Sequence, residues 1–411
     1  MRSKKVFLRL VALPAILVFL LAARVLAQEK VLYDFIGGRN DGSDPEGAIV
    51  FDSAGNIYGT ACFGGLYNHG SVFELIPAGN GVWTEAVLHV FNSHATDGHH
   101  PRGSLALDSA GNLYGTTEEG GAYNYGTVFE ISPLAHGAWT ETVLHNFGGG
   151  HDGQLPIAGL IFDTSGNLYG TTIAGGAYSS GTIFELTPAG AGSWTESILH
   201  DFKHDGVDGM DPAASLTFDA SGNLYGTTTL GGSYNKGTVF ELTPAAGGGW
   251  DEITLYSFGA DKDGKLPYSS VIFDSAGNLY GTTTAGGDHA NGGAVFELMP
   301  QAGGSWSEAI LHNFGQSSED GNYPDAGLIF DASGNLYGTT SYGGTYADGT
   351  VFELTPTVGG VWTLTILHRY GKGADGRYPD ASVIFDAAGN LYGTTSGGGT
   401  DGGGIVFEIA H

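Results

Sequence analysis

The chain has 411 residues, of which 72 are glycine and only 14% are charged, and its formal net charge is −28. A hydrophobic fraction of 41% provides enough apolar surface for a core, which excludes an intrinsically disordered chain. The glycines follow no G-X-Y period, which excludes collagen. Abundant glycine and aromatic residues with few lysines favour many short strands joined by tight turns.

Residues 1–27 have the layout of a secretory signal peptide. A basic start precedes an apolar run from Val11 to Ala23, and Val25-Leu26-Ala27 provides a small-residue cleavage site. We therefore expect a secreted protein, extracellular or periplasmic, whose first mature residue is Gln28. An uncleaved N-terminal anchor is the alternative. No later apolar run reaches ~18 residues, so no membrane span is expected after cleavage.

Removal of this segment makes the chain more acidic. Five of the 15 Lys and Arg residues lie within it and none of the 43 Asp and Glu residues does, so the rest carries ten basic residues against 43 acidic ones, a net charge of −33. A body of this charge repels phosphate backbones and anionic membrane surfaces. The sequence therefore excludes nucleic acid as a partner.

A tandem repeat of about 55 residues occupies the rest of the chain. The motif F-D-x-x-G-N-L-Y-G-T occurs seven times, each time after D-G-x-x-P and before a segment like G-T-V-F-E-L. Its asparagines are Asn56, Asn112, Asn167, Asn223, Asn278, Asn335 and Asn390. No linker separates any two copies, so we expect residues 28–411 to form a single domain.

Each copy contains four apolar segments, which in the third copy are residues 159–162, 167–172, 181–186 and 194–202. Short runs rich in Val, Ile, Phe, Tyr and Thr between Gly, Pro, Asn and Asp indicate strands. Four strands per copy are typical of a propeller blade. The sequence therefore predicts an all-β, seven-bladed β-propeller of four-stranded blades. A β-solenoid, which usually has shorter coils, is the alternative.

An aspartate begins the turn between the first two strands of every copy. In Asp163-Thr-Ser-Gly166 it occupies the first position of a type I turn, and the glycine occupies the position that needs positive φ. The aspartate is expected to accept a hydrogen bond from the backbone two residues on. Calcium binding is the alternative. The seven aspartates are Asp52, Asp108, Asp163, Asp219, Asp274, Asp331 and Asp386.

The two chain ends are out of phase with the repeat. A strand that begins with tryptophan follows the first six copies, whereas the chain stops at His411 before a seventh. Val31–Phe35 matches the end of such a strand, so we expect it to pair with the strand that ends in Phe407-Glu408-Ile409 and close the last blade. Val31, Leu32, Tyr33 and Phe35 should then be buried.

The motif F-D-x-x-G-N-L-Y-G-T-T with G-G-x-Y-x-x-G-T-V-F-E-L resembles the Gloeo/Verruco (GloVer) repeat of secreted bacterial proteins, across residues 31–409. The resemblance implies export and a tandem-repeat β fold, and it implies no activity and no catalytic residues. Members often carry a C-terminal sorting tail, which is not found here, so we expect release rather than anchoring. The D-x-x-G-N-L-Y element is more weakly similar to the NHL and streptogramin-lyase propellers.

Several residues that suggest chemistry have structural interpretations. Cys62 aligns with six residues of four other types in the remaining copies, which indicates an incidental substitution rather than a nucleophile. Histidine follows Val/Ile-Leu in five copies, at His89, His145, His200, His312 and His368. Because Tyr33 and Tyr256 replace it elsewhere, this position favours a hydrogen-bonding ring over a metal ligand.

Small residues precede each first strand and should line a crowded central channel. The residue after each repeat proline varies and should lie at the mouth of that channel: Glu46, Arg102, Ile157, Ala213, Tyr268, Asp325 and Asp380. The polar members, Glu46, Arg102, Tyr268, Asp325 and Asp380, are our candidate ligand-binding residues. An unconstrained loop position is the alternative.

A second candidate site lies in the loops of the first two blades. The second–third loop and the blade-to-blade loop emerge on one face, where His69, His94, His99, His100, Glu118 and Glu119 should converge. Imidazoles with carboxylates could bind a divalent metal or supply acid–base groups. Ordinary solvated loop residues are the alternative. No other cofactor is expected.

Three classes of function stay open. A non-catalytic binding module for an extracellular polymer or protein, present as a monomer, is the one we favour. A propeller hydrolase or lyase with a site on the loop face and a structural surface or matrix protein are the alternatives. No catalytic residue can be assigned from the sequence.

Overall fold

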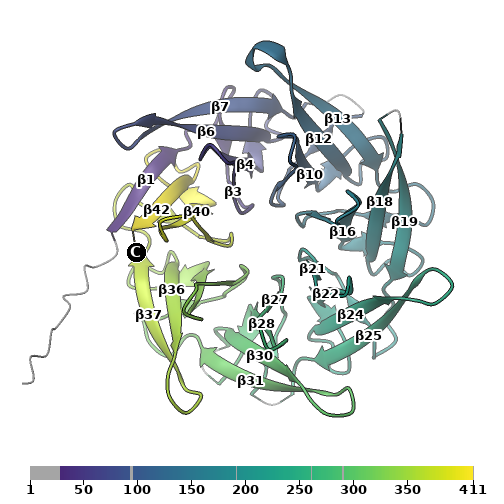
Figure 1. Cartoon of the computed structure of the whole chain (residues 1–411). Coiled ribbons are helices and arrows are strands. Elements are labelled where there is room, and N and C mark those ends of the chain that lie inside the picture. Colours follow the sequence, from purple (N-terminus) through teal and green to yellow (C-terminus); the bar gives the residue numbers. More distant parts are fainter. Residues whose placement is uncertain (1–27, 93–95, 191, 261, 289–290, 411) are drawn as a thin grey trace, which may run out of the picture.

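The computed structural model describes residues 28–92, 96–190, 192–260, 262–288 and 291–410. Seven four-stranded antiparallel sheets are arranged as blades around a central axis (Figure 1). The predicted all-β, seven-bladed propeller is confirmed. The predicted signal peptide lies outside the described residues. Within the described ranges, no helix is long and apolar enough to cross a membrane.

Each blade runs from a two-residue inner strand to a long outer strand. From the axis outward, blade 1 contains β3 (Val50–Phe51), β4 (Ile57–Ala61), β6 (Ser71–Gly79) and β7 (Val82–Val90); blade 2 contains β9 (Ala106–Leu107), β10 (Leu113–Thr117), β12 (Thr127–Pro133) and β13 (Trp139–Asn146); and blade 3 contains β15 (Ile161–Phe162), β16 (Leu168–Thr172), β18 (Thr182–Gly190) and β19 (Ser193–Asp201). Blade 4 contains β21 (Thr217–Phe218), β22 (Leu224–Thr228), β24 (Thr238–Pro244) and β25 (Trp250–Ser257), and blade 5 contains β27 (Ile272–Phe273), β28 (Leu279–Thr283), β30 (Ala294–Pro300) and β31 (Trp306–Asn313). Blade 6 contains β33 (Ile329–Phe330), β34 (Leu336–Thr340), β36 (Thr350–Pro356) and β37 (Trp362–Arg369), and blade 7 contains β39 (Ile384–Phe385), β40 (Leu391–Thr395), β42 (Ile405–Ala410) and β1 (Gln28–Asp34).

A two-stranded ladder caps every blade and joins its second–third loop to the connection that precedes the blade. These loops therefore share one face, which we call the loop face. The ladders were not predicted from the sequence. They are β2 (Gly42–Ser43) with β5 (Phe63–Gly64), β8 (Gly98–His99) with β11 (Glu119–Gly120), β14 (Gly153–Gln154) with β17 (Ala174–Gly175), β20 (Gly209–Met210) with β23 (Leu230–Gly231), β26 (Gly264–Lys265) with β29 (Ala285–Gly286), β32 (Gly321–Asn322) with β35 (Tyr342–Gly343), and β38 (Gly376–Arg377) with β41 (Gly397–Gly398). One short 3₁₀ turn, η1 (Ala135–Gly137), precedes β13.

The N-terminal strand closes the ring. Strand β1 pairs antiparallel with β42, with Val31 opposite Phe407, and the two lie side by side in Figure 1. The predicted closure is confirmed. Leu32 and Phe35 are buried, Tyr33 is half-buried, and Val31 is 37% exposed. The expectation that Val31 is buried was wrong, because β1 is an outer strand and this side chain faces away from the neighbouring blades.

The first turn of each blade has the predicted geometry. Gly166 has φ of +87°, and Asp163 Oδ1 accepts hydrogen bonds from the backbone N–H groups of Ser165 and Asn167, both at 2.8 Å. Its Oδ2 accepts a further bond from Asn167 Nδ2 at 2.9 Å. The same side-chain and backbone pattern recurs at the other six turns. The aspartate is therefore occupied by its own turn.

The core lies between blades and repeats from one interface to the next. The aromatic residue after each outer strand meets a phenylalanine of the next blade, as in Phe91 with Phe129 at 5.2 Å between ring centroids, and both are fully buried. A Cβ at Gly115 would lie 2.6 Å from the Phe129 ring. The glycine of N-L-Y-G therefore makes room for this ring, because interiors are close-packed.

A β-bulge interrupts every outer strand pair one residue before the recurring His or Tyr. In blade 1, Val72 pairs with His89 and Phe73 pairs with Val87, so Leu88 is the extra residue. A bulge bends the strand and redirects the next side chain. The ring of His89 is thereby directed toward the connection to blade 2, where it lies 3.6 Å from Asp97 Oδ1.

Candidate functional site at the mouth of the central channel

The residue after each repeat proline lines the central channel. A cavity of about 150 Å³ is bounded by these seven residues and by the small residues that follow them in each copy. The small residues are needed because seven chains converge there: a Cβ at Gly103 would lie 2.6 Å from the Ala158 backbone. Side-chain variety is therefore confined to the mouth.

The residue before each repeat proline has a positive φ in all seven copies, between +55° and +61°, although none is glycine. Its carbonyl accepts the N–H of the loop residue that follows the second strand, as Tyr378 does from Ser396 at 2.9 Å. Such conformations cost about 1–3 kcal/mol each and are held by their surroundings. The seven residues are Asp44, His100, Leu155, Asp211, Leu266, Tyr323 and Tyr378.

Arg102 joins two carboxylates of the mouth. Its Nη1 lies 2.6 Å from Glu46 Oε1, and its Nε lies 2.6 Å from Glu118 Oε2. All three side chains are a quarter to a third exposed. Glu46 and Glu118 keep the pKa of the guanidinium above its ordinary value although burial opposes this. The cation at this mouth is therefore already neutralised by its neighbours.

Asp325 and Asp380 place two carboxyl groups on the other side of the mouth. Ser341 Oγ donates to Asp325 Oδ1 at 2.5 Å, and Ser396 Oγ donates to Asp380 Oδ2 at 2.6 Å. Burial, with Asp380 nearby, raises the pKa of Asp325 to about 7. Burial also raises the pKa of Asp380. These two carboxyl groups have no cationic partner among the described residues.

Asp44 extends this acidic region toward Glu46. Burial, then Glu46 and Asp380, raise the pKa of Asp44 to about 6, and only Arg102 acts in the opposite direction. A second cavity beside the mouth is lined by Asp44, Glu46, Tyr378 and Ser396. The carboxyl groups of blades 6, 7 and 1 therefore lie close enough to influence one another, and we call them the acidic half of the mouth (Asp44, Glu46, Asp325, Asp380).

Three tyrosines stand beside the acidic half. The rings of Tyr323 and Tyr342 lie 5.7 Å apart, and those of Tyr342 and Tyr378 lie 5.3 Å apart. Tyr323 and Tyr342 are nearly half exposed. Burial and the nearby Asp380 raise the pKa of Tyr342. The opposite half carries Ile157 and Ala213, with Tyr268 between the halves, so the mouth is polar on one side only.

The loop-face cluster of blades 1 and 2 is partly assembled. The rings of His69 and His99 stack at 3.9 Å and 7°, and His100 Nδ1 lies 3.6 Å from Glu119 Oε2. Burial lowers the pKa of His69 and of His100. Glu118 turns away to Arg102, as described above, and His94 lies outside the described residues. Metal binding by this cluster stays a prediction.

The residues assigned to the scaffold have partners in the scaffold. Cys62 is a buried free thiol whose pKa burial raises. Five recurring histidines lie within 3.0–3.6 Å of the aspartate of the next D-G-x-x-P motif. The glutamate of V-F-E-L accepts from the tyrosine of N-L-Y, as in Tyr169 Oη to Glu185 Oε1 at 2.8 Å.

Sequence reasoning missed the tyrosines and serines of the mouth. Tyr323 and Tyr378 precede the repeat proline, where the residue type varies as freely as at the position after it, and this variation is the signal that could have identified them. Ser341 and Ser396 align with Cys62, a position that the sequence analysis set aside as accepting any residue. Both positions vary because they face the mouth.

Comparison with family models decides the relationship of the chain to known proteins. The model of the Gloeobacter/Verrucomicrobia repeat matches residues 22–161, 136–330 and 293–411. The chain belongs to this family. None of the curated proteins matches the sequence.

Among solved structures, those similar to the repeat protein include parts of two longer chains. One is the extracellular domain of a putative one-component system of B. thetaiotaomicron, with a TM-score of 0.56 and 13% identity over 94% of this chain and 42% of that one. The other is an ancestral GH74 enzyme, with a TM-score of 0.57 and 11% identity over 93% and 51%. The chain spans about half or less of these neighbours, and identities this low show a shared propeller fold only.

Proposed function

We propose that this protein is a secreted, non-catalytic binding module that captures cationic groups of an extracellular polymer or protein at the mouth of its channel. The observation that carries the proposal is the acidic half of the mouth, whose carboxyl groups crowd together beside exposed tyrosines. The repeat-invariant aspartates of the first turns and the tyrosines of N-L-Y are hydrogen-bonded within the scaffold, as at Asp163 and Tyr169. The mouth is where the copies differ, and function on a repeat scaffold resides in such positions.

Electrostatics favours an amine or guanidinium as the ligand group. Burial raises the pKa of both Asp325 and Asp380, and the nearby Asp380 adds to the shift of Asp325, because neither carboxyl group has a cationic partner among the described residues. A cation at this point would remove that penalty, since an opposite charge within ~4–6 Å favours the carboxylate form. The charge of the whole body also draws cations toward it.

The tyrosines suit the same ligand. A cation within about 6 Å of an aromatic face is attracted by the ring quadrupole, by about 0.5–1 kcal/mol at exposed sites. Tyr323, Tyr342 and Tyr378 form a continuous aromatic edge next to the two aspartates. An extended basic segment could therefore place one cation at the carboxyl groups and lie along the tyrosine rings.

Calorimetric titration of residues 28–411 with hexalysine tests the proposal. At about 0.15 M salt, which screens exposed charges beyond roughly 8 Å, hexalysine should bind and its Nε-acetylated form should not. The double variant D325N/D380N should bind about tenfold more weakly or worse, a loss of about 1.4 kcal/mol. Affinity should rise with pH through about 7, as Asp325 loses its proton.

A charge-matched variant distinguishes the mouth from general attraction to an acidic surface. Glu319 and Asp401 are exposed and lie outside the acidic half. The variant E319Q/D401N should bind hexalysine like the parent. If both double variants lose affinity equally, or neither does, the mouth is not the binding site and the proposal is wrong.

A further inference from the structure

A second set of chemical groups recurs at the junctions between blades. At each complete junction, the histidine at the end of one outer strand meets the aspartate of the following D-G-x-x-P motif. A glutamate from the outer strand of the next blade completes the group. The three possible ligand atoms lie within 4.8 Å of one another at four junctions: His89–Asp97–Glu141, His145–Asp152–Glu196, His200–Asp208–Glu252 and His368–Asp375–Glu29.

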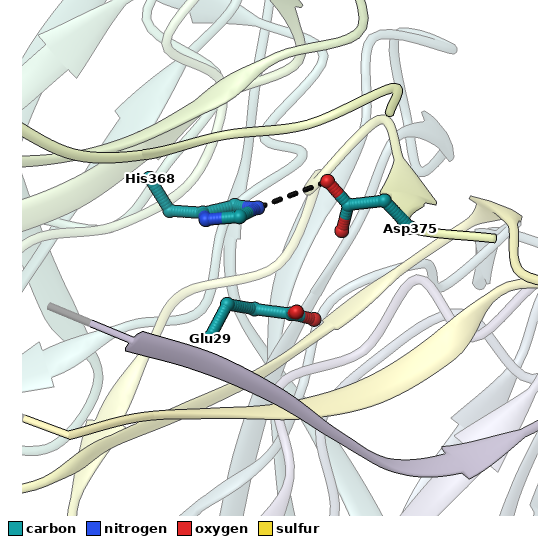
Figure 2. A group of neighbouring side chains, drawn as sticks. All are labelled: Glu29, His368 and Asp375. Carbon is teal, nitrogen blue, oxygen red and sulfur yellow. Dashed lines mark hydrogen bonds and ion pairs between the residues drawn. The ribbon is translucent and has the colours of Figure 1, made fainter. Parts of the chain in front are cut away.

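Figure 2 shows the junction that closes the ring. His368 Nε2 lies 3.0 Å from Asp375 Oδ2, and the Glu29 carboxyl group reaches toward the same point from strand β1. The three side chains come from blade 6, the connection to blade 7, and the N-terminal strand. Groups so far apart in sequence are brought together only by the assembled ring.

The junction between blades 1 and 2 leaves three ligand atoms facing one another without hydrogen bonds. His89 Nε2, Asp97 Oδ1 and Glu141 Oε1 are all buried and lack a hydrogen-bond partner. Asp97 is only 6% exposed. Its other oxygen accepts the backbone N–H of Asn92 at 2.9 Å, which fixes the carboxylate so that Oδ1 points into the cluster. A buried polar atom without a partner costs about 1–3 kcal/mol.

The next junction repeats this arrangement. His145 Nε2 lies 3.0 Å from Asp152 Oδ2 and 3.7 Å from Glu196 Oε2, while Asp152 Oδ1 and Glu196 Oε1 have no hydrogen-bond partner. With a neutral imidazole and two carboxylates, each cluster would carry two negative charges in a partly buried site. No lysine or arginine pairs with these clusters among the described residues.

We propose that each of these four clusters binds one divalent transition-metal ion between two blades. One imidazole nitrogen and two carboxylate oxygens are ligands that Zn²⁺ accepts in tetrahedral sites, with water in the fourth position. Two carboxylates and a divalent ion leave the site neutral. Calcium, which takes six to eight oxygen ligands, does not suit one imidazole and two carboxylates.

The chain itself contains incomplete copies that serve as controls. Tyr33 and Tyr256 replace the histidine at two junctions, where Tyr256 Oη donates to Asp263 Oδ2 at 3.2 Å. Leu364 replaces the glutamate at another, where His312 still lies 3.5 Å from Asp320. These junctions fold with the same backbone but lack one ligand. His→Tyr and Glu→Leu are therefore substitutions that this scaffold already accommodates.

Metal content and thermal stability test the proposal. Residues 28–411, stripped with chelator and equilibrated with Zn²⁺, should bind up to four ions per chain and melt several degrees higher. Co²⁺ in place of Zn²⁺ should give visible absorption. Each of H89Y, H145Y, H200Y and H368Y should lose one ion, and E141L should match H89Y. H136N, which removes an exposed imidazole that belongs to none of the four clusters, should lose none.

Each histidine is replaced singly, so the test of metal binding does not depend on whether a variant that lacks all four histidines folds. If Zn²⁺ neither binds stoichiometrically nor raises the melting temperature, the clusters share protons rather than metal and the proposal is wrong. It is also wrong if the His→Tyr variants bind as much as the parent. Loss of the ion only in H69N/H99N would assign the metal to the loop-face cluster instead.

Discussion

Each repeat keeps one aspartate whose carboxylate satisfies backbone groups that the first turn leaves without partners. Asp163 accepts three hydrogen bonds of 2.8–2.9 Å within four residues of itself. The sequence was sufficient to predict this role, because donor, acceptor and glycine all lie in one short segment. The additional bond from Asn167 Nδ2 explains why asparagine follows the glycine in the motif.

Loss of that carboxylate should destabilise the blade. D163A removes three accepted hydrogen bonds, so the free energy of unfolding should fall by about 1–3 kcal/mol. D163N keeps one oxygen acceptor and should lose less. Urea denaturation of both variants measures the difference. A calcium-dependent rise of the melting temperature that disappears in D163A would instead favour the calcium site that the sequence left open.

Other residue-scale features could not be predicted, because they depend on neighbours that are distant in sequence. The recurring histidine position was predicted to need a hydrogen-bonding ring, and at His145 the aspartate Asp152 supplies the partner at 3.0 Å. Glu141, by contrast, comes from the outer strand of the next blade and carries no signal in the repeat that contains His89. Glu118, which was predicted to lie in the histidine cluster, instead forms an ion pair with Arg102.

At the scale of the element, strand β1 is the part on which closure depends. The phase shift between the chain ends predicted its partner. Leu32, the extra residue of the β-bulge in this strand, is buried while Val31 is exposed. Phe35 completes the last aromatic pair, 5.1 Å from Phe73. The sequence could not show which of Val31, Leu32, Tyr33 and Phe35 would be buried, because all four are apolar or aromatic.

Truncation measures what this element contributes. A chain that starts at Gly37 loses β1, exposes β42 as an edge strand, and leaves the Leu32 and Phe35 sites empty. At about 1.5–3 kcal/mol per large apolar side chain, together with the lost strand pairing, the loss approaches a typical domain stability of about 5–15 kcal/mol. The chain should not melt cooperatively above room temperature, whereas a chain starting at Gln28 should. Equal melting of the two would show that the ring closes in another way.

At the scale of the whole molecule, the blade junctions make stability depend on pH. Burial, then a neighbouring aspartate, raises the pKa of Glu29, Glu141 and Glu252 to about 7 and that of Glu196 to about 9. Glu85 and Glu308 are raised to about 7 and about 8. The folded state therefore keeps protons that the unfolded chain, with an ordinary pKa of 4.5, releases.

The direction in which stability changes with pH follows from this difference in bound protons. Stability contributed by protonated glutamates is fully present below about pH 4.5 and is lost as the pH rises through about 7 to 9. The loss should be about 1–3 kcal/mol per glutamate after solvent screening is allowed for. In the presence of chelator, the urea concentration at the midpoint of unfolding should decrease as the pH is raised from about 5 to about 9. E196Q, whose amide is neutral at every pH, should show a shallower fall. A midpoint that stays constant or rises would contradict the account.

The most direct test of the binding proposal is a crystal structure of residues 28–411 with bound hexalysine. The account predicts one lysine ammonium group within hydrogen-bond distance of the carboxyl groups of Asp325 and Asp380, with the peptide lying along Tyr323, Tyr342 and Tyr378. Peptide bound at the outer edges of the blades, or at the apolar half of the mouth near Ile157, would contradict it.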